Sequence, residues 1–340
     1  MERESNIGIV GLGSYVPGEG LGIEEFVSGN GTAVDNAPLF APPKKRHHVS
    51  RDERAGEMVA QATRPMLERL GVDPADGIDL IITNTLLPDD LITGCGSEVA
   101  DLLGCRPRTI IDLHNGGCAS FAFMLDLART IIASGAARTA LLSNTQNLTG
   151  QLFTQPGHRQ TSQAAVPGDG CGVAYVAAGA GSPLLGVATL NEPSCWSDMY
   201  VDVEGRKYWE AGEGEVMISF DREKRKQIVE RGNQLVPKAV REVCTQLDMS
   251  PSDIDVLITN QPNRLYLRHW RKALGIEPDR HVDTFDEYGN LYGAGLSMTL
   301  EHAVRTGTVQ DGDLVMLAGF AHAGDLAAAA AVRWQSAAHD

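Results

Sequence analysis

The sequence predicts an α/β fold built from two similar halves, because strand-like and helix-like segments alternate and the chain resembles itself. Residues 73–85 (DPADGIDLIITNT) are echoed by residues 250–261 (SPSDIDVLITNQ). Residues 137–144 (ARTALLSN) are echoed by residues 312–319 (GDLVMLAG) at nearly the same offset. Two matches at about one offset indicate a duplicated unit, and the alternation is typical of a mostly parallel sheet covered by helices.

The chain of 340 residues is long enough for two domains of ordinary size. We predict an N-terminal half at residues 1–180 and a C-terminal half at residues 181–340, meeting in the loop-like stretch 178–186. In the register of the repeat, the turn before Cys118 corresponds to the glycine-containing turn at Tyr292–Gly293. We therefore expect the two turns to face each other across a pseudo-twofold axis, where both halves contribute to one site.

The individual segments carry recognisable periodicities. Residues 7–12 and 109–113 are rich in apolar and β-branched side chains, which predicts strands, the second of them buried. Residues 55–70 and 228–247 have amphipathic spacing, which predicts helices. Residues 118–135 carry apolar side chains on nearly every face and end at a glycine, which predicts a buried helix.

Cys118 lies where the predicted strand 109–113 gives way to that buried helix, after the tight turn His114–Gly117. A thiol at a helix N-terminus meets unpaired backbone N–H groups and the positive end of the helix dipole. Both favour the thiolate, so the position predicts a lowered pKa and a nucleophile. The alternative is a small core residue, because free cysteine is often buried.

The composition indicates which cellular compartment to expect and whether the protein binds a metal. No signal-peptide pattern opens the sequence, and no apolar stretch approaches the length that spans a membrane. The cysteines form no CxxC pair, and no histidines cluster at metal-ligand spacing. We expect a reduced, cytoplasmic, metal-free protein. The six scattered cysteines are Cys95, Cys105, Cys118, Cys171, Cys195 and Cys244.

A net charge of −15 argues against nucleic acid as the main partner and would repel an acidic carrier protein. Docking of such a carrier therefore requires a local basic patch. Residues 263–274 predict a helix with an apolar stripe formed by Leu267, Trp270 and Leu274. The candidate carrier-binding residues on that helix are Arg264, Arg268, Arg271 and Lys272. The alternative is an ordinary solvated helix face.

Seven segments recur in the order of a known family. They are residues 11–17 (GLGSYVP), 71–73 (GVD), 78–82 (IDLII), the Cys118 turn, 167–172 (PGDGCG), 288–290 (YGN) and 312–320 (GDLVMLAGF). With these motifs the chain resembles β-ketoacyl-ACP synthase III of the thiolase superfamily. The resemblance implies a five-layered αβαβα fold with two pseudo-twofold related halves, and a homodimer. It also implies an acyl-accepting Cys118, with an acyl-CoA or phosphopantetheine-carrier thioester as substrate and no tightly bound cofactor or metal.

The resemblance further implies two polar groups from the second half, a histidine and an asparagine that stabilise the enolate of a malonyl donor. Asn290 matches the family asparagine, but the segment 259–263 (TNQPN) places Asn260 at the histidine position. An amide donates hydrogen bonds but cannot exchange a proton near neutral pH or become cationic. Because losing one such group typically costs about 10²–10³ in rate, decarboxylative condensation is less strongly expected here.

The loop after Gly319 also departs from the family pattern and is one residue longer, reading Phe320–Gly324 (FAHAG). In relatives this loop supplies a backbone N–H to the oxyanion hole, which implies Ala321 and Cys118 as the two donors here. His322 is our first candidate for a replacement base. His114 and His281 are further candidates.

These features favour an acyltransferase. Cys118 accepts an acyl group from an acyl-CoA or acyl-carrier thioester and passes it to a hydroxyl or amine acceptor in specialised, polyketide- or antibiotic-type metabolism. Asn260 and Asn290 then orient the small-molecule acceptor. The alternatives are decarboxylative condensation with a malonyl thioester and a non-catalytic partner subunit, although subunits of that kind typically lack the nucleophile that this chain keeps.

Overall fold

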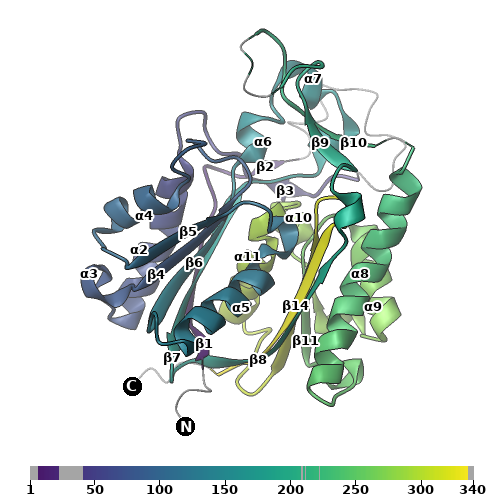
Figure 1. Cartoon of the computed structure of the whole chain (residues 1–340). Coiled ribbons are helices and arrows are strands. Elements are labelled where there is room, and N and C mark those ends of the chain that lie inside the picture. The colour runs from purple at the N-terminus through teal and green to yellow at the C-terminus, as the bar shows by residue number, and fades with distance from the viewer. Residues whose placement is uncertain (1–6, 23–40, 208–209, 211, 222, 336–340) are drawn as a thin grey trace.

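The computed structural model describes residues 7–22, 41–207, 210, 212–221 and 223–335. The main strands of the first half are β1 (Ile7–Tyr15), β4 (Leu80–Thr85), β5 (Thr109–Leu113), β6 (Thr139–Gln146) and β7 (Gly170–Ala178). Those of the second half are β8 (Ser182–Asn191), β11 (Val256–Thr259), β12 (His281–Val282), β13 (Leu314–Ala321) and β14 (Leu326–Arg333). Together they form a ten-stranded sheet in the order β12-β11-β13-β14-β8-β1-β7-β6-β4-β5 (Figure 1).

The sheet is symmetric about the pairing of β1 with β8. From that junction outward each half has two antiparallel pairings, β1 with β7 and β7 with β6 in the first half and β8 with β14 and β14 with β13 in the second. Two parallel pairings follow, with β4 between β6 and β5 and β11 between β13 and β12. The junction itself consists of Gly8 opposite Pro183 and Ile9 opposite Ser182. The echoed segments 73–85 and 250–261 end in the equivalent strands β4 and β11. The sequence repeat therefore corresponds to a structural repeat.

Helices cover both faces of each half of the sheet and produce five layers. The long helices are α2 (Ala55–Leu70), α5 (Ser120–Ala133), α8 (Arg225–Gln246), α9 (Arg264–Leu274) and α11 (Gly295–Arg305). Helices α5 and α11 lie between the two halves of the sheet, α2 packs on the outer face of the first half, and α8 and α9 on the outer face of the second (Figure 1). The predicted αβαβα arrangement is confirmed.

Shorter elements complete the fold. The short helices are α3 (Pro74–Gly77), α4 (Gly96–Leu103), α6 (Leu148–Gln151), α7 (Pro156–Arg159) and α10 (Phe285–Tyr288). The 3-10 turns are η2 (Gly117–Ala119), η3 (Ser162–Ala165), η4 (Pro193–Cys195), η5 (Pro251–Asp253), η6 (Pro278–Arg280) and η7 (Tyr292–Ala294). Two small sheets pair β2 (Leu21–Gly22) with β3 (Lys45–Arg46) and β9 (Met199–Asp202) with β10 (Met217–Phe220). None of the described helices is long and apolar enough to cross a membrane.

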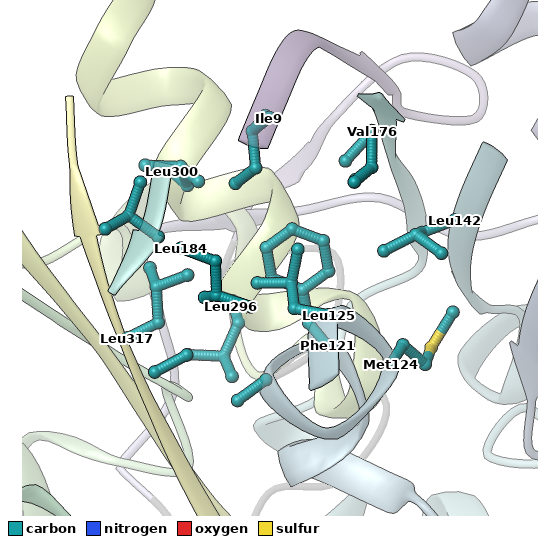
Figure 2. Close-up of a cluster of buried hydrophobic side chains, with 14 of the residues drawn as sticks. Ile9, Phe121, Met124, Leu125, Leu142, Val176, Leu184, Leu296, Leu300 and Leu317 are labelled. Carbon is teal, nitrogen blue, oxygen red and sulfur yellow. The ribbon is translucent and has the colours of Figure 1, made fainter. Parts of the chain in front are cut away.

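The central layer explains why residues 118–135 are apolar on almost every face. Phe121, Met124 and Leu125 of α5 point into a core that both halves of the sheet share with Leu296 and Leu300 of α11 (Figure 2). Burying each such side chain contributes about 1.5–3 kcal/mol. This core anchors α5, and α5 in turn fixes the position of the Cys118 turn directly before it.

The burial of one strand and the ends of several elements differ from the sequence predictions. β5 is an edge strand whose Thr109 and Asp112 are exposed, so the prediction of a buried strand there is wrong. Apolar β-branched residues suit a half-covered edge as well as a buried strand. The helix predicted at 228–247 begins at Arg225. The junction predicted at 178–186 is shorter, because β8 begins at Ser182. The division into domains at residues 180 and 181 stays a prediction, since the sheet continues across it.

Candidate active site

A cavity of about 740 Å³ lies where the two halves meet. Its lining from the first half includes Asn84, Gly117, Cys118, Gln146 and His158, and from the second half Asn260, Asn290, Tyr292, Phe320 and His322. The structure therefore brings all four predicted catalytic side chains, Cys118, Asn260, Asn290 and His322, to one cavity. Farther from Cys118 in the chain, β9, β10 and the start of α8 add a mostly apolar wall.

The Cys118 turn is tightly enclosed. Cys118 occupies η2, immediately before α5, and Gly117 ahead of it has a φ of +48°. A Cβ on Gly117 would lie 2.8 Å from Cβ of Ala321 and 3.0 Å from Nε2 of His322, so only glycine fits. A Cβ on Gly293 in η7 would lie 3.1 Å from the Gly117 carbonyl oxygen. The two equivalent turns thus face each other, as the repeat predicts.

Cys118 is 9% exposed as a residue, and burial raises the pKa of its thiol to about 12. The Asn260 side chain opposes this shift, while the Asp325 carboxylate adds to it. The prediction of a lowered pKa is therefore wrong, because removing the thiolate from water outweighs the local groups that favour it. A thiol in this state stays protonated at neutral pH and needs a base to become a nucleophile.

The two asparagines present amide groups to the cavity. Asn260 follows β11 and is 1% exposed. Its amide nitrogen and oxygen are buried and have no hydrogen-bond partner in the described part of the chain. Asn290 accepts a hydrogen bond from the Tyr292 backbone N–H at 3.0 Å through Oδ1, which leaves its amide nitrogen as a donor. An amide polarises a carbonyl oxygen but cannot take up a proton at neutral pH, so neither residue is a base.

His322 has the geometry of a base. It follows β13 with a φ of +48°, and its Nδ1 lies 3.0 and 3.1 Å from the two carboxylate oxygens of Asp325. The opposite nitrogen, Nε2, faces the Gly117–Cys118 turn. Sequence reasoning missed Asp325, although an acidic residue three positions after a histidine in a tight turn is a readable signal.

The other candidate histidines are not placed for this role. His114 is exposed, and neither it nor His281 lines the cavity. His281 binds the Thr259 hydroxyl at 2.9 Å, and burial lowers its pKa to about 3. His158 does line the cavity and was missed, but its Nε2 accepts a hydrogen bond from the Ile218 backbone N–H at 3.3 Å.

Ala321 is the last residue of β13 and lies against the Cys118 turn, because a Cβ on Gly117 would lie 2.8 Å from Cβ of Ala321. This contact brings the end of β13 beside the nucleophile. The predicted oxyanion hole, made by the backbone N–H groups of Cys118 and Ala321, is compatible with this placement and stays a prediction.

Helix α9 bears the candidate carrier-docking face. Its apolar stripe is buried as predicted and comprises Leu267, Trp270 and Leu274. Arg268 and Lys272 are exposed, and their side chains make no ion pair or hydrogen bond within the described ranges. Arg264 differs, because its guanidinium pairs with Asp286 and donates to the Pro42 carbonyl oxygen at 3.2 Å. The Arg264 side chain is thus bound to other parts of the protein. The positive charges that are free to contact a partner are those of Arg268 and Lys272, further along the helix.

Comparison with known proteins extends over nearly the whole chain. Family models described as 3-oxoacyl-(acyl-carrier-protein) synthase III and its C-terminal part match residues 111–192 and 244–334, about half of the chain. The β-ketoacyl-(acyl-carrier-protein) synthase III of Oceanobacillus iheyensis is 27% identical over 340 residues, covering 97% of this chain and 99% of that protein. That of Clostridium perfringens is 24% identical over 321 residues, covering 93% and 95%.

Solved structures show the same fold. The 3-oxoacyl-(acyl carrier protein) synthase III of Pseudomonas aeruginosa superposes with a TM-score of 0.83 at 22% identity, covering 97% of this chain and 99% of that chain. OleA from Xanthomonas campestris superposes with a TM-score of 0.81 at 20% identity, covering 97% and 98%. The matched family models include the Cys118 turn in one case, and Asn260, Asn290 and His322 in the other. The chain therefore belongs to the 3-oxoacyl-(acyl-carrier-protein) synthase III family of the thiolase superfamily.

Proposed function

We propose that this protein is an acyltransferase that forms an acyl-Cys118 intermediate and passes the acyl group to a hydroxyl or amine. The observation that carries the proposal is the pairing of His322 with Asp325 beside the Cys118 turn, in a cavity where Asn260 stands at the family histidine position. Decarboxylative condensation generates its carbon nucleophile by loss of CO₂. A hydroxyl or amine acceptor must instead lose a proton to a base, and His322 is placed to be that base.

The reaction proceeds in two balanced halves. Cys118 attacks the thioester carbonyl of an acyl-CoA or acyl-carrier donor, and the donor leaves as a free thiol. The acceptor oxygen or nitrogen then attacks the acyl-Cys118 carbonyl while its proton moves to Nε2 of His322, and the Cys118 sulfur leaves and recovers a proton. Backbone N–H groups of Cys118 and Ala321 stabilise each tetrahedral oxyanion, and the amides of Asn260 and Asn290 orient the acceptor.

The acceptor belongs to specialised, polyketide- or antibiotic-type metabolism in this proposal, and the protein acts as a cytoplasmic homodimer without a tightly bound cofactor. A non-catalytic partner subunit is disfavoured because Cys118, a candidate base and an open cavity occur together. The competing activity is decarboxylative condensation, and the names of the relatives favour it. It is tested by offering acylated enzyme a malonyl thioester and measuring CO₂ release. Brisk decarboxylation coupled to a β-ketoacyl product would overturn the proposal.

Replacing Asn260 by histidine tests why the chemistry differs. We expect the Asn260→His variant to gain decarboxylation of a malonyl thioester by about 10²–10³-fold, because a protonated ring stabilises the enolate that an amide supports only weakly. Release of ¹⁴CO₂ from labelled malonyl thioester measures the gain. The Asn260→Gln variant is the matched control, since it keeps an amide and should gain nothing. Equal behaviour of the two variants would show that residue 260 does not divert the reaction.

Reversing the charge of Arg268 tests carrier docking on α9. We expect Arg268→Glu to slow turnover of carrier-bound substrate about tenfold at low salt, because a chain with a net charge of −15 attracts an acidic carrier only through a local basic patch. A small N-acetylcysteamine thioester should react at the normal rate. Arg106→Glu, at an exposed position before β5 in the other half, changes the net charge equally and is the control. Equal losses with both substrates would point to misfolding and reject the dock.

A further inference from the structure

Formation of the acyl-enzyme requires a base of its own. Burial raises the pKa of the Cys118 thiol to about 12, so the helix N-terminus does not ionise it unaided. Asn260, beside the sulfur, cannot accept a proton. Of the described residues, His158 and His322 are the histidines that line the cavity. His158 already uses the lone pair of Nε2 to accept the Ile218 N–H, which places its proton on Nδ1. His322 is the remaining candidate.

The hydrogen bonds of His322 fix its tautomer. Both carboxylate oxygens of Asp325 lie within hydrogen-bond distance of Nδ1, at 3.0 and 3.1 Å, and a carboxylate only accepts. The ring therefore carries its proton on Nδ1 and presents the lone pair of Nε2. That atom lies 3.0 Å from the position a Cβ on Gly117 would take, one residue before the nucleophile. Nε2, the ring nitrogen that can accept a proton, therefore faces the turn that carries Cys118.

The loop that carries His322 is fixed from two sides. The Glu192 backbone N–H at the end of β8 donates to the Asp325 carbonyl oxygen at 2.8 Å. Arg231 of α8 donates to the Ala323 carbonyl oxygen through Nε and Nη2 at 3.1 and 2.9 Å, and Asp198, which is 1% exposed, binds Arg231 in turn. A positive φ at a non-glycine residue such as His322 is kept only where the surroundings enforce it. These contacts supply that constraint.

We propose that Cys118, His322 and Asp325 work as a nucleophile–base–carboxylate triad in the acylation step. Nε2 of His322 takes the Sγ proton as the sulfur attacks the donor carbonyl, and the donor sulfur receives that proton as the donor leaves as a thiol. Asp325 is a positioning residue, because it holds the ring and stabilises the imidazolium that forms. The triad rests on the acyl-enzyme of the proposed function, and it gives His322 the same role in both halves of the reaction.

Alkylation of Cys118 by iodoacetamide tests the triad without any acyl donor. The sulfur displaces iodide and its proton leaves to the base, so the rate followed by intact mass reports activation of the thiol alone. We expect His322→Ala to slow alkylation about 10²-fold at neutral pH. Imidazole added to the buffer should restore part of that rate, which a purely structural role of His322 would not allow. His114→Ala, outside the cavity, is the control and should match the unsubstituted protein.

Asp325→Asn tests the positioning role. We expect alkylation to slow about tenfold, because the ring loses the carboxylate that holds its Nδ1 proton and its orientation. Asp325→Glu should recover part of the rate. Unchanged alkylation in His322→Ala, or no rescue by imidazole, would overturn the triad, and unchanged alkylation in Asp325→Asn would remove Asp325 from it. Decarboxylation by acylated enzyme would instead reject the proposed acceptor chemistry and leave the triad standing.

Discussion

Cys118→Ala is expected to abolish acyl transfer completely. The intact protein incubated with a mixture of acyl-CoA or acyl-carrier thioesters should gain the mass of one acyl group, and the variant should gain none. The physical reason is that the proposed reaction has no route around a covalent thioester, and Cys118 is the only cysteine among the described residues that line the cavity. Removing a catalytic nucleophile typically costs about 10⁴–10⁶ in rate, which makes this the largest effect predicted for the protein.

Another buried cysteine supplies the control for that experiment. Cys244 of α8 is 2% exposed, packs in the outer core of the second half and does not line the cavity. Cys244→Ala should keep the full acyl mass gain. An equal mass gain in Cys118→Ala and the unsubstituted protein would show that the acyl group resides elsewhere, and would reject both the acyl-enzyme and the triad built on it.

Gly117→Ala is expected to have the next largest effect, a loss of about 10²-fold or more in the rate of acylation. The added Cβ would lie 2.8 Å from Ala321 and 3.0 Å from Nε2 of His322, so the base and the end of β13 must move away from the thiol. A misplacement of about 1 Å in a reacting geometry can cost about 10²-fold. Stopped-flow or quenched acylation, followed by mass, measures the loss.

Gly135→Ala is the control that distinguishes this steric collision from the backbone strain that any alanine at a positive φ introduces. Gly135 follows α5 with a φ of +76°, and a Cβ there would meet nothing within 4 Å. Gly135→Ala should therefore lower the free energy of unfolding by about 1–2 kcal/mol, as a left-handed non-glycine residue does, and leave acylation unchanged. If Gly117→Ala and Gly135→Ala are acylated at the same rate, steric crowding at the Cys118 turn is not the reason that position 117 requires glycine.

Local signals were sufficient to predict much of this site. The strand, glycine turn and helix around Cys118 are consecutive in the sequence, so their pattern places the nucleophile before a helix. The repeat places the turn at Gly293 opposite it, because equivalent strands end at the same region of the molecule. Helix α9 was also predictable from a local signal, because the apolar residues of its buried stripe recur at helical spacing.

Most of what was missed or wrong depends on the folded arrangement of the chain rather than on local sequence patterns. The thiol pKa depends on how completely the second half covers Cys118, which no local pattern reports. Asp286, the partner of Arg264, lies on α10, and only the folded chain brings that carboxylate to α9. Asp325 lies three residues from His322, but its role depends on the turn between β13 and β14 directing both side chains together.

The place of β1 in the sheet has a consequence for synthesis on the ribosome. The strand Ile7–Tyr15 is made first, yet its partners are β7 (Gly170–Ala178) and the start of β8. At a translation speed of about 5–20 residues per second, roughly 10–30 s pass before a partner emerges. During that interval the apolar side chains of Ile7, Ile9 and Leu12 have no sheet to join. The nascent chain therefore leaves these side chains without their native sheet partners until β7 is complete, and the N-terminal half closes only as the C-terminal half begins.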